Sequence, residues 1–561
     1  MFTRLSLFHR QSSGSLLQLK MMSFLSKMTT AGAGEDYVED FVCDENDIAE
    51  NQMKAVELDG GKVLLVKQKG KLTAIGNKCT HFGALLSTGA LGDGRVRCPW
   101  HGACFNTETG DIEDFPGLDS LPCFQVTVDQ GKIKVRAKRS ELQAGKRQRT
   151  MAARQLEDDR TFVVIGGGPS GAVCAESLRQ EGFAGRLVLI NKEPCLPYDR
   201  IVVSKALNFE LDKKLLRNEN FYSEHDIETM IGVEATDLNT QNQELTLSNG
   251  YKIKYDKVYI ATGSKARKLS IEGSDLKNVC VLRTFEDAKA VNAQLGEDKD
   301  VVVLGTSFIG LEAAAYCVGK AKKITIVGRG TVPLKESFGD QIGHRVMELF
   351  QEKGVEFVMN SGIKRFIGNA NGELEAVEIL DGSILKVDVC VMGTGATLYT
   401  SFLEGSGVKI NKNGSLDTNL YLETNIRGIY AGGDVANAPV FCNNNELSAI
   451  GHYGLAQYHG KIAALNMLGK TKELRTVPYF WTMLFGKGFR YTGYGTPHET
   501  IIEGDLSQLS FVAFYLDANG KVIAMASCGR DPVVSQFAEF LSQGKTLHKS
   551  DLSPDPFAWT K

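Results

Sequence analysis

Residues 161–171 read TFVVIGGGPSG, a short apolar run that ends in a glycine-rich turn. The run is typical of a buried strand, and the residues after Gly171 are typical of a helix. In such a turn Gly166 allows the tight bend, Gly168 leaves room for a pyrophosphate, and Gly171 lets the helix pack closely on the strand. The N-terminus of the helix then faces the phosphates. The segment therefore predicts a dinucleotide-binding βαβ unit.

A second segment of this kind, VVVLGTSFIGLE, occupies residues 301–312. Gly305 and Gly310 match the outer glycines, whereas Ser307 replaces the middle one and narrows the approach to a pyrophosphate. Because Glu312 interrupts the apolar run, we expect a buried strand and helix there rather than a membrane span. Short β-branched strands alternate with helical segments around both units, which predicts parallel sheets in two nucleotide-binding domains.

Residues 36–137 show a different pattern, in which short strands are separated by turn signals such as Lys69-Gly70 and Gln130-Gly131. These signals are typical of hairpins and predict a small all-β domain. Residues 131–155 then carry nine lysines or arginines and one acid. Such a run is typical of a solvated linker, and the alternative is a docking patch for an acidic partner.

Four potential metal ligands lie inside the predicted β domain. Cys79 and His81 are followed, after sixteen residues, by Cys98 and His101. Two thiolates for one iron and two imidazoles for the other are the ligands of a Rieske [2Fe–2S] cluster. A zinc finger is the alternative, but its ligands run Cys, Cys and then His, His. The spacing therefore favours the Rieske cluster.

The composition is that of a globular protein, with 43% hydrophobic and 23% charged residues. The net charge of −3 offers no basic field for nucleic acid, and 12 widely spaced cysteines indicate a reducing compartment. Residues 1–34 are cationic, rich in serine and free of acids, as mitochondrial presequences are. We therefore expect a mitochondrial protein; a disordered tail on a cytoplasmic protein is the alternative.

Further short motifs follow in order: PYDR at 197–200, SK at 204–205, ATG at 261–263, AGGD at 431–434 and PYFW at 478–481. In this order they resemble the NAD(P)H:ferredoxin reductase class of flavoproteins. With the Cys/His domain in front, the chain beyond residue 36 resembles the apoptosis-inducing factor-like, Rieske-containing FAD/NAD(P)H oxidoreductases. The resemblance implies a multidomain fold: an all-β Rieske domain, an α/β flavoprotein with two dinucleotide-binding domains as in glutathione reductase, and a C-terminal α/β domain.

We expect the domain boundaries to follow this order. Residues 1–34 are a targeting or disordered segment, 36–137 the Rieske [2Fe–2S] domain, 138–157 a basic linker, 158–285 and 401–475 the two parts of the FAD-binding domain, 286–400 the NAD(P)-binding domain, and 476–561 the C-terminal reductase domain.

The resemblance also implies which residues hold the cofactors FAD, NAD(P)H and [2Fe–2S]. Lys205 and Glu312 would be catalytic, as an ion pair beside the flavin. From its spacing alone, Glu193 is the acid available to the FAD ribose, since it lies 22 residues after Gly171. The FAD-binding residues would be Gly166, Gly168, Gly171, Glu193, Arg200, Lys205, Ala261, Asp434 and Trp481. The NAD(P)-binding residues would be Gly305, Ser307, Gly310 and Arg329, and the metal ligands would be Cys79, His81, Cys98 and His101.

Three features bear on the details of the chemistry. Gly328 and Arg329 stand where an NAD-preferring site has an acid, so either NADPH is used, with Arg329 on its 2′-phosphate, or nicotinamide binding is weak. Respiratory Rieske subunits carry one further cysteine in each ligand loop, whereas here Cys104 has Ala84 in its partner's place, which predicts a ferredoxin-type cluster. Cys195 has no neighbouring cysteine, so the cysteine pair of a disulfide reductase is missing. The rival redox chemistry is that of a peroxidase with a single reactive cysteine.

Together these features predict an NAD(P)H-dependent FAD oxidoreductase that passes electrons to its own Rieske cluster. The onward acceptor, a protein or a small molecule, is not indicated by the sequence, and a homo-oligomer is open. We expect no nucleic-acid partner and no transmembrane segment. The resemblance also implies a role in apoptosis, and the alternative function is a redox-responsive cell-death effector with little turnover.

Overall fold

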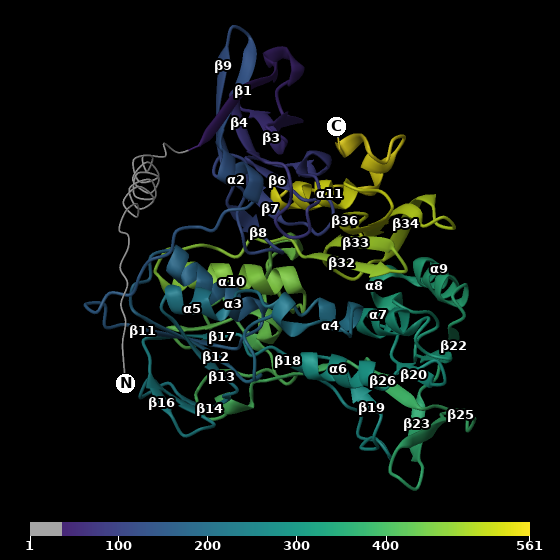
Figure 1. Cartoon of the computed structure of the whole chain (residues 1–561). Coiled ribbons are helices and arrows are strands. Elements are labelled where there is room, and N and C mark those ends of the chain that lie inside the picture. Colours follow the sequence, from purple (N-terminus) through teal and green to yellow (C-terminus); the bar gives the residue numbers. More distant parts are fainter. Residues whose placement is uncertain (1–35, 561) are drawn as a thin grey trace, which may run out of the picture.

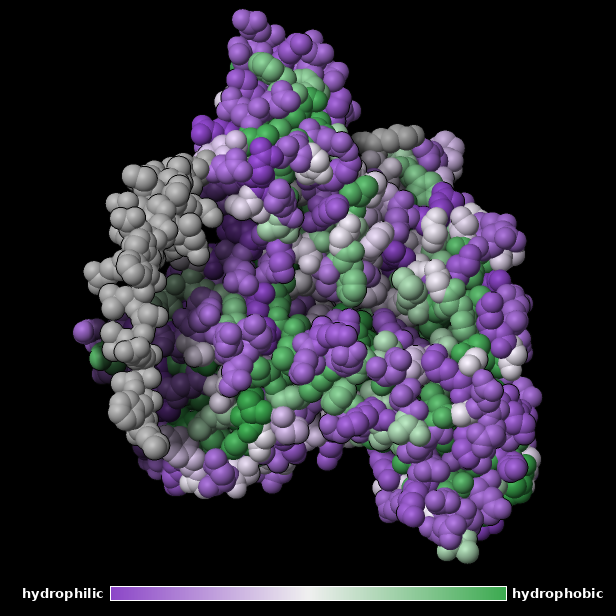
Figure 2. Space-filling view, in the orientation of Figure 1, coloured by the Kyte–Doolittle hydropathy of each residue, from purple (hydrophilic) through white to green (hydrophobic). Residues whose placement is uncertain are grey.

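The computed structural model describes residues 36–560, so the predicted targeting segment 1–34 lies outside the described residues. Figure 1 shows the N-terminal β domain at the top of the molecule, beside the C-terminal domain. Both rest on a body formed by two nucleotide-binding domains. Hydrophilic residues cover most of the face shown in Figure 2, interrupted by smaller hydrophobic areas. The predicted fold class is confirmed by this architecture and by the sheets described below.

The N-terminal domain contains two antiparallel sheets. The larger has the order β1-β10-β9-β4-β3-β2, with bounds Tyr37–Asp44, Lys132–Lys138, Cys123–Asp129, Lys71–Gly76, Gly61–Gln68 and Gln52–Leu58. The smaller has the order β5-β6-β7-β8, with bounds Ala90–Leu91, Arg95–Arg97, Cys104–Asn106 and Ile112–Asp114. Val63, Leu65 and Ile133 are fully buried and belong to one hydrophobic core of this domain.

The first nucleotide-binding domain is a parallel sheet with the order β13-β12-β11-β17-β29. Its strands are Ile227–Ile231, Arg186–Asn191, Thr161–Ile165, Lys257–Ile260 and Ile429–Ala431, and helices α3 (Pro169–Gln180) and α10 (Tyr453–Met467) pack together beside it. Gly460 lets the two helices approach closely, because a Cβ there would collide with the carbonyl of Ser170.

The second nucleotide-binding domain has the parallel order β19-β26-β20-β21-β22. Its strands are Val279–Val281, Val389–Met392, Asp300–Leu304, Lys323–Val327 and Glu356–Val358, and α7 (Phe308–Cys317) follows β20. The apolar run 301–319 therefore forms a strand and a helix as predicted. The predicted boundary at 286 is too late for the sheet, since β19 pairs with β26. No helix within residues 36–560 is long and apolar enough to cross a membrane.

The C-terminal domain is an antiparallel sheet covered by α11 (Val533–Ser542). The strand order is β32-β33-β36-β35-β34, with bounds Tyr479–Leu484, Lys487–Gly493, Val522–Cys528, Ser510–Leu516 and Glu499–Asp505. Val534, Phe537, Ala538 and Leu541 recur at helical spacing in α11, and all are buried.

Smaller helices and strands complete the body: α4 (Val202–Lys205), α5 (Glu219–Glu224), α6 (Phe285–Ala293), α8 (Lys335–Phe338), α9 (Asp340–Gln351), β14–β16 (Ala235–Asn239, Glu244–Leu247, Lys252–Lys254), β18 (Ser264–Ala266), β23–β25 (Ile363–Gly368, Leu374–Ile379, Ile384–Lys386), β27 (Ala396–Leu398), β28 (Leu416–Asp417), β30 (Ala436–Val440) and β31 (Glu446–Ala449).

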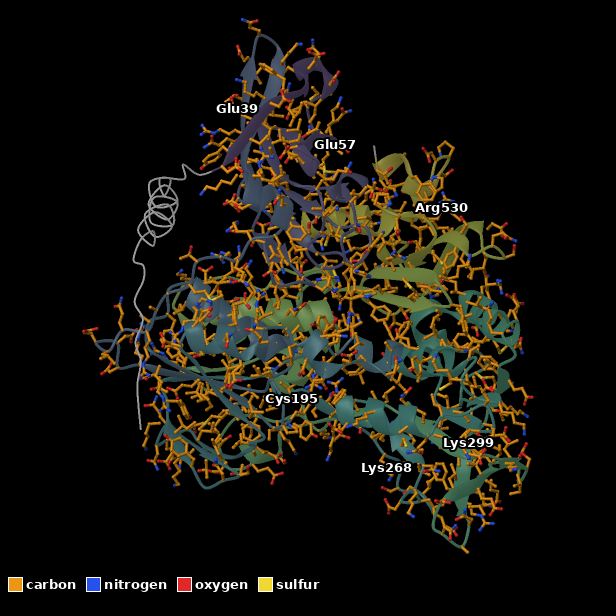
Figure 3. The ribbon with its side chains drawn as sticks, viewed as in Figure 1. Glu39, Glu57, Cys195, Lys268, Lys299 and Arg530 are labelled. Carbon is orange, nitrogen blue, oxygen red and sulfur yellow. The ribbon has the colours of Figure 1, made fainter. Side chains whose placement is uncertain are left out.

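The basic segment after the β domain begins with α2 (Arg139–Ala144) and then runs along the surface. Its cations are paired within the chain: Arg147 with Asp111 at 2.5 Å, Arg149 with Glu181 at 2.8 Å, and Arg154 with Glu228 at 3.5 Å. These pairs favour the linker interpretation, because the same side chains are not free for an acidic partner. Glu39 and Glu57 belong to the β domain, in the upper part of the view in Figure 3.

Buried polar contacts fix the β domain on the first nucleotide-binding domain. Arg217 bridges the two, with a nitrogen 2.7 Å from Asp119 and 2.9 Å from Glu176 of α3. The ammonium group of Lys461 in α10 donates to the carbonyl of Ile112 at 2.7 Å. Because the side chains of the Arg217 bridge are almost fully buried, separating the domains would leave charges without partners.

We predict that Arg217→Ala lowers the melting temperature of the protein, since it leaves two buried carboxylates facing each other. Breaking one partner of a buried ion pair typically costs about 3 kcal/mol or more. The measurements are thermal unfolding by circular dichroism and the rate of protease cleavage within residues 138–157. Lys213→Ala is the control, because Lys213 forms an exposed pair with Glu210. Melting and cleavage identical to this control would contradict the bridging role.

Candidate redox centre

The four predicted metal ligands lie on two neighbouring loops of the β domain. Cys79 and Cys98 are 3% and 1% exposed, and their thiols are within hydrogen-bonding reach of each other. His81 and His101 lie outside them, with their Nδ1 atoms 3.1 Å apart. Each loop therefore supplies one thiol to an inner pair and one imidazole to an outer pair.

Both ligand loops turn back on themselves at a glycine with positive φ. Gly83, with φ of 78°, donates its N–H to the carbonyl of Cys79 at 2.8 Å. Gly102, with φ of 79°, donates to the carbonyl of Cys98 at 3.3 Å. A side chain would strain this backbone conformation. The N–H groups of the residues inside each turn point at the thiols, namely those of His81, Phe82, Trp100 and His101.

The electrostatics of this cluster suit metal binding. Burial lowers the pKa of His81 to about 4. Burial, His81 and the cations Arg490 and Lys205 lower the pKa of His101 to about 3. Both imidazoles are therefore neutral at pH 7, which is the form that binds metal.

The donors form two pairs rather than one group. Within the described part of the chain, no three His, Cys, Asp or Glu side chains gather closely enough to hold one metal ion. A two-iron cluster with thiolates on one iron and imidazoles on the other needs this separation. The geometry therefore fits the predicted Rieske ligands better than a single tetrahedral zinc.

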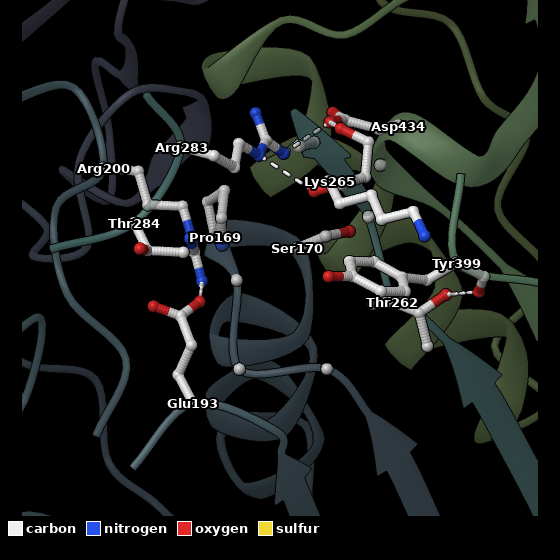
Figure 4. Close-up of a pocket in the computed structure, with 18 of the residues that line it drawn as sticks. Pro169, Ser170, Glu193, Arg200, Thr262, Lys265, Arg283, Thr284, Tyr399 and Asp434 are labelled. Atoms are coloured by element: carbon white, nitrogen blue, oxygen red, sulfur yellow. Dashed lines mark hydrogen bonds and ion pairs between the residues drawn. The ribbon is translucent and has the colours of Figure 1, made fainter. Parts of the chain in front are cut away.

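A cavity of about 690 Å³ opens between the two nucleotide-binding domains and the C-terminal domain. Its volume is in the range of cofactor sites. Of the residues predicted to bind FAD, all but Gly171 line it; Gly171 lies behind, where a Cβ would collide with the carbonyl of Gly166. Figure 4 shows Glu193, Arg200 and Asp434 with their side chains around this cavity.

Two predicted FAD-binding carboxylates are held by neighbours. Glu193 forms an ion pair with Arg200 and accepts a hydrogen bond from Tyr198 at 2.8 Å. Asp434 accepts hydrogen bonds from Ser264 at 2.8 Å and Arg283 at 2.7 Å. Burial raises the pKa of Asp434, but Arg283, Ser264 and Arg200 together outweigh it and bring the pKa below its ordinary value. The carboxylate is therefore ionised and fixed in place.

Lys205 and Glu312, predicted to be catalytic, form an ion pair at the cavity wall. Glu312 also accepts hydrogen bonds from Ser204 at 2.5 Å and from Thr482 at 2.6 Å. Its side chain is only 4% exposed, and that of Lys205 is 26% exposed. Three donors from two segments, α4 and β32, thus fix the carboxylate, while the ammonium group reaches the cavity.

Trp481 joins the two predicted sites. Its side chain lines the cavity, and its ring centroid lies 4.7 Å from that of His101 and 6.0 Å from that of His81. Trp481 therefore contacts both the proposed flavin pocket and the proposed cluster site.

The predicted nicotinamide residues lie where β20 passes into α7. Ser307 is the N-cap residue of α7, and Gly310 lies close to the carbonyl of Gly305. At the end of β21, the side chain of Thr306 fills the space next to Gly328, where a Cβ would collide with it. Arg329 is exposed. The strand end therefore offers a cation and no carboxylate.

Several lining residues were not predicted from the sequence. Arg283 holds Asp434 from between β19 and α6, a place that no sequence motif marks. The buried Nδ1 of His452 has no hydrogen-bond partner among the described residues, and its ring lies 5.2 Å from that of Phe480. Phe308 contacts Phe480 in turn, at 4.2 Å. A signal for Phe480 was present, since it precedes Trp481 in the aromatic motif.

The cysteines give no support to thiol-based redox chemistry. All the cysteines of the described chain are free. Burial, with a contribution from Glu193, raises the pKa of the Cys195 thiol to about 11. A reactive cysteine needs a lowered pKa, so the peroxidase alternative is disfavoured.

Comparison with known proteins identifies the two parts of the chain. Residues 39–125 match the Rieske [2Fe-2S] domain, and residues 160–460 match the family described as pyridine nucleotide-disulphide oxidoreductase. The chain is therefore an oxidoreductase with FAD, NAD(P)H and a [2Fe–2S] cluster as its cofactors.

The proteins similar to this chain include an apoptosis-inducing factor and ferredoxin reductases. Apoptosis-inducing factor 3 of Mus musculus is 40% identical over 524 residues, which cover 92% of this chain and 86% of that protein. The benzene 1,2-dioxygenase system ferredoxin–NAD(+) reductase subunit of Pseudomonas putida is 32% identical over 66% of this chain and 89% of its own length. A solved ferredoxin reductase from Rhodopseudomonas palustris has a TM-score of 0.65 at 25% identity, covering 70% of this chain and 96% of that one. The chain belongs to the apoptosis-inducing factor-like, Rieske-containing family of FAD/NAD(P)H oxidoreductases.

Proposed function

We propose that this chain carries electrons from NAD(P)H through its flavin pocket to its own Rieske site, and from there to an acceptor outside the chain. Bound FAD takes hydride from NAD(P)H, and a Rieske cluster takes single electrons. The relatives named as ferredoxin reductases support the first half of this reaction. The Rieske domain in the same chain supports the second half, because fusion gives donor and acceptor a high effective concentration.

The position of Trp481 is the observation that carries the proposal. The indole contacts His101 and also lines the cavity. No rearrangement is needed to bring the two sites together, since buried ion pairs already hold the domains in contact. Electron transfer within the chain is therefore expected to need neither collision nor domain movement.

The residues of the pocket have separate tasks in this proposal. The turn 166–171 would bind the FAD pyrophosphate, and Asp434 would accept hydrogen bonds from the sugar-like chain of the cofactor. Lys205 would place a positive charge and a proton donor, its Nζ, at the reactive end of the pocket. Ser204 and Thr482 orient Glu312, which in turn holds Lys205.

The onward acceptor is a protein or a small molecule that takes one electron at a time. Phe82 and Trp100, next to the two histidines, are 54% and 41% exposed, so the proposed cluster site can be approached from solvent. Mitochondrial targeting is proposed from the composition of residues 1–34. A role in apoptosis is proposed from the name of the relatives; a cell-death effector with little turnover is the second candidate.

We predict that anaerobic NAD(P)H bleaches the flavin first and then reduces the cluster, at a rate independent of protein concentration. Trp481→Leu slows the second phase by at least about tenfold, equivalent to about 1.4 kcal/mol of barrier, because the ring between the two sites is lost. Stopped-flow absorbance separates the phases. Trp100→Leu is the matched control, since its ring is on the solvent side of His101. A second phase that accelerates with protein concentration would refute electron transfer within the chain. Negligible turnover with any added acceptor would favour the second candidate function, a cell-death effector.

We predict that Lys205→Ala and Glu312→Ala slow flavin reduction about tenfold or more while FAD binding changes less. The reason is that the pair lines the cavity and that the family resemblance implies a position at the flavin edge rather than on the phosphates. Flavin bleaching by stopped flow is compared with FAD affinity by fluorescence. Glu312→Gln is expected to behave like Glu312→Ala, because the carboxylate charge is what pairs with Lys205. Wild-type reduction rates in both alanine variants would exclude the catalytic assignment.

We predict that NADPH reduces the protein at least as efficiently as NADH, because β21 ends without a carboxylate. Arg329→Ala lowers kcat/KM for NADPH alone by about tenfold, the loss expected for one charge-assisted hydrogen bond of about 1.5 kcal/mol. The double variant Gly328→Glu, Thr306→Gly places an acid at the end of β21. The second substitution is needed because Thr306 fills the space that the new side chain takes. Strong preference for NADH that is unaffected by Arg329→Ala would show that this assignment is wrong.

A further inference from the structure

The second ligand loop, Cys98–Gly102, is held by residues of another domain. Arg97 directly precedes the loop, and its guanidinium donates to the carbonyl of Gly102 at the end of the loop, at 2.8 Å. The same guanidinium donates to Glu539 of α11 at 2.6 Å. Both ends of the loop are thereby tied to one buried arginine, which is itself held by the C-terminal domain.

A second contact from α11 reaches the loop directly. The hydroxyl of Ser535 donates to the carbonyl of Cys98 at 2.9 Å. The hydroxyl of Tyr479 lies 3.1 Å from that of Ser535. Because Ser535 and Glu539 are four residues apart, they lie on the same face of α11. One face of this helix therefore contacts both the loop and the arginine that closes it.

The β domain has glycines where these C-terminal residues approach. A Cβ on Gly92 would collide with the carboxylate of Glu539, and a Cβ on Gly102 would lie 2.6 Å from the ring of Tyr479. Arg95 also binds Glu539, at 2.9 Å. The β domain thus contributes glycines and an arginine to this interface, and the C-terminal domain contributes the side chains that fit against them.

The first ligand loop is held differently, by its own domain. Its threonine, Thr80, donates to the carbonyl of Asp119 at 2.7 Å. Asn77, just before the loop, accepts a hydrogen bond from the N–H of Ser87 at 2.9 Å. The support of the cluster site is therefore asymmetric, and α11 acts on the Cys98–His101 side.

We propose that α11 is part of the metal site as a positioning element: Ser535 directly, and Glu539 through Arg97, fix the loop Cys98–Gly102 and set the reduction potential of the cluster bound there. The inference rests on the proposed function, since it takes Cys98 and His101 as ligands. Outer hydrogen bonds and nearby charge are the means by which a protein adjusts such a potential. The C-terminal domain of the reductase thereby adjusts the acceptor to which it delivers electrons.

The test is a potentiometric titration of the full-length holoprotein with dithionite and mediators, followed by the electron paramagnetic resonance of the reduced cluster. Glu539→Gln removes a negative charge behind the loop, so it raises the potential, by about tenfold in the one-electron equilibrium or about 60 mV. Ser535→Ala removes the positive end of an O–H dipole aimed at the loop, so it lowers the potential. Opposite signs are the signature, because a general loosening of the interface would move both variants in the same direction.

Glu176→Gln is the matched control. Glu176 also carries a buried ion pair between the β domain and the rest of the chain, through Arg217, but it does not contact the ligand loop. An unchanged potential in this control, with opposite shifts in the two α11 variants, supports the proposal. If Glu539→Gln does not accumulate, a lowered potential in Ser535→Ala together with an unchanged potential in Glu176→Gln decides for it.

Three results would overturn the proposal: unshifted potentials in the α11 variants, shifts of the same sign, or an equal shift in Glu176→Gln. A wild-type protein without a Rieske signal would overturn the proposed function and this inference together. A wild-type signal with unshifted α11 variants would overturn this inference alone, because chemical reduction does not depend on transfer from the flavin.

Discussion

Arg97 and Glu539 meet across the interface between the N-terminal and C-terminal domains, with side chains only 1% and 4% exposed. Taking two charges out of water is unfavourable unless each finds its partner and its remaining hydrogen bonds. Both conditions are met here, since Arg95 also binds Glu539 and Asp114 also binds Arg97. The network is complete only while the domains touch. It therefore keeps the loops that carry the candidate ligands in a fixed position beside the reductase domains.

The strand β32 then brings the two candidate sites into contact. Successive side chains of a strand point to opposite faces of the sheet. Trp481 points toward His101, and the next residue, Thr482, donates to Glu312. One strand thus contacts the proposed cluster site with one face and holds the proposed catalytic pair with the other. The docking of the β domain and the order of the flavin pocket are linked through these two adjacent residues.

The parts that were predictable from the sequence share one property: their determinants lie within a few residues of each other. The glycine turns at 166–171 and 305–310 have the strand, turn and helix that were predicted. The pairs Cys79/His81 and Cys98/His101 come together as the spacing predicted, because each pair belongs to one loop. The boundary at 286 was wrong for the sheet, since pairing of β19 with β26 joins segments more than a hundred residues apart.

The sequence by itself therefore determined the fold class, the nucleotide-binding turns and the set of candidate metal ligands, because local backbone geometry and ligand chemistry depend on neighbouring residues. Only the tertiary structure decided what supports them. Arg283 on Asp434, Thr482 on Glu312 and Ser535 on Cys98 are contacts between distant segments. No motif marks such a residue, since a serine or an arginine becomes a support only where folding buries it against a partner that needs a hydrogen bond.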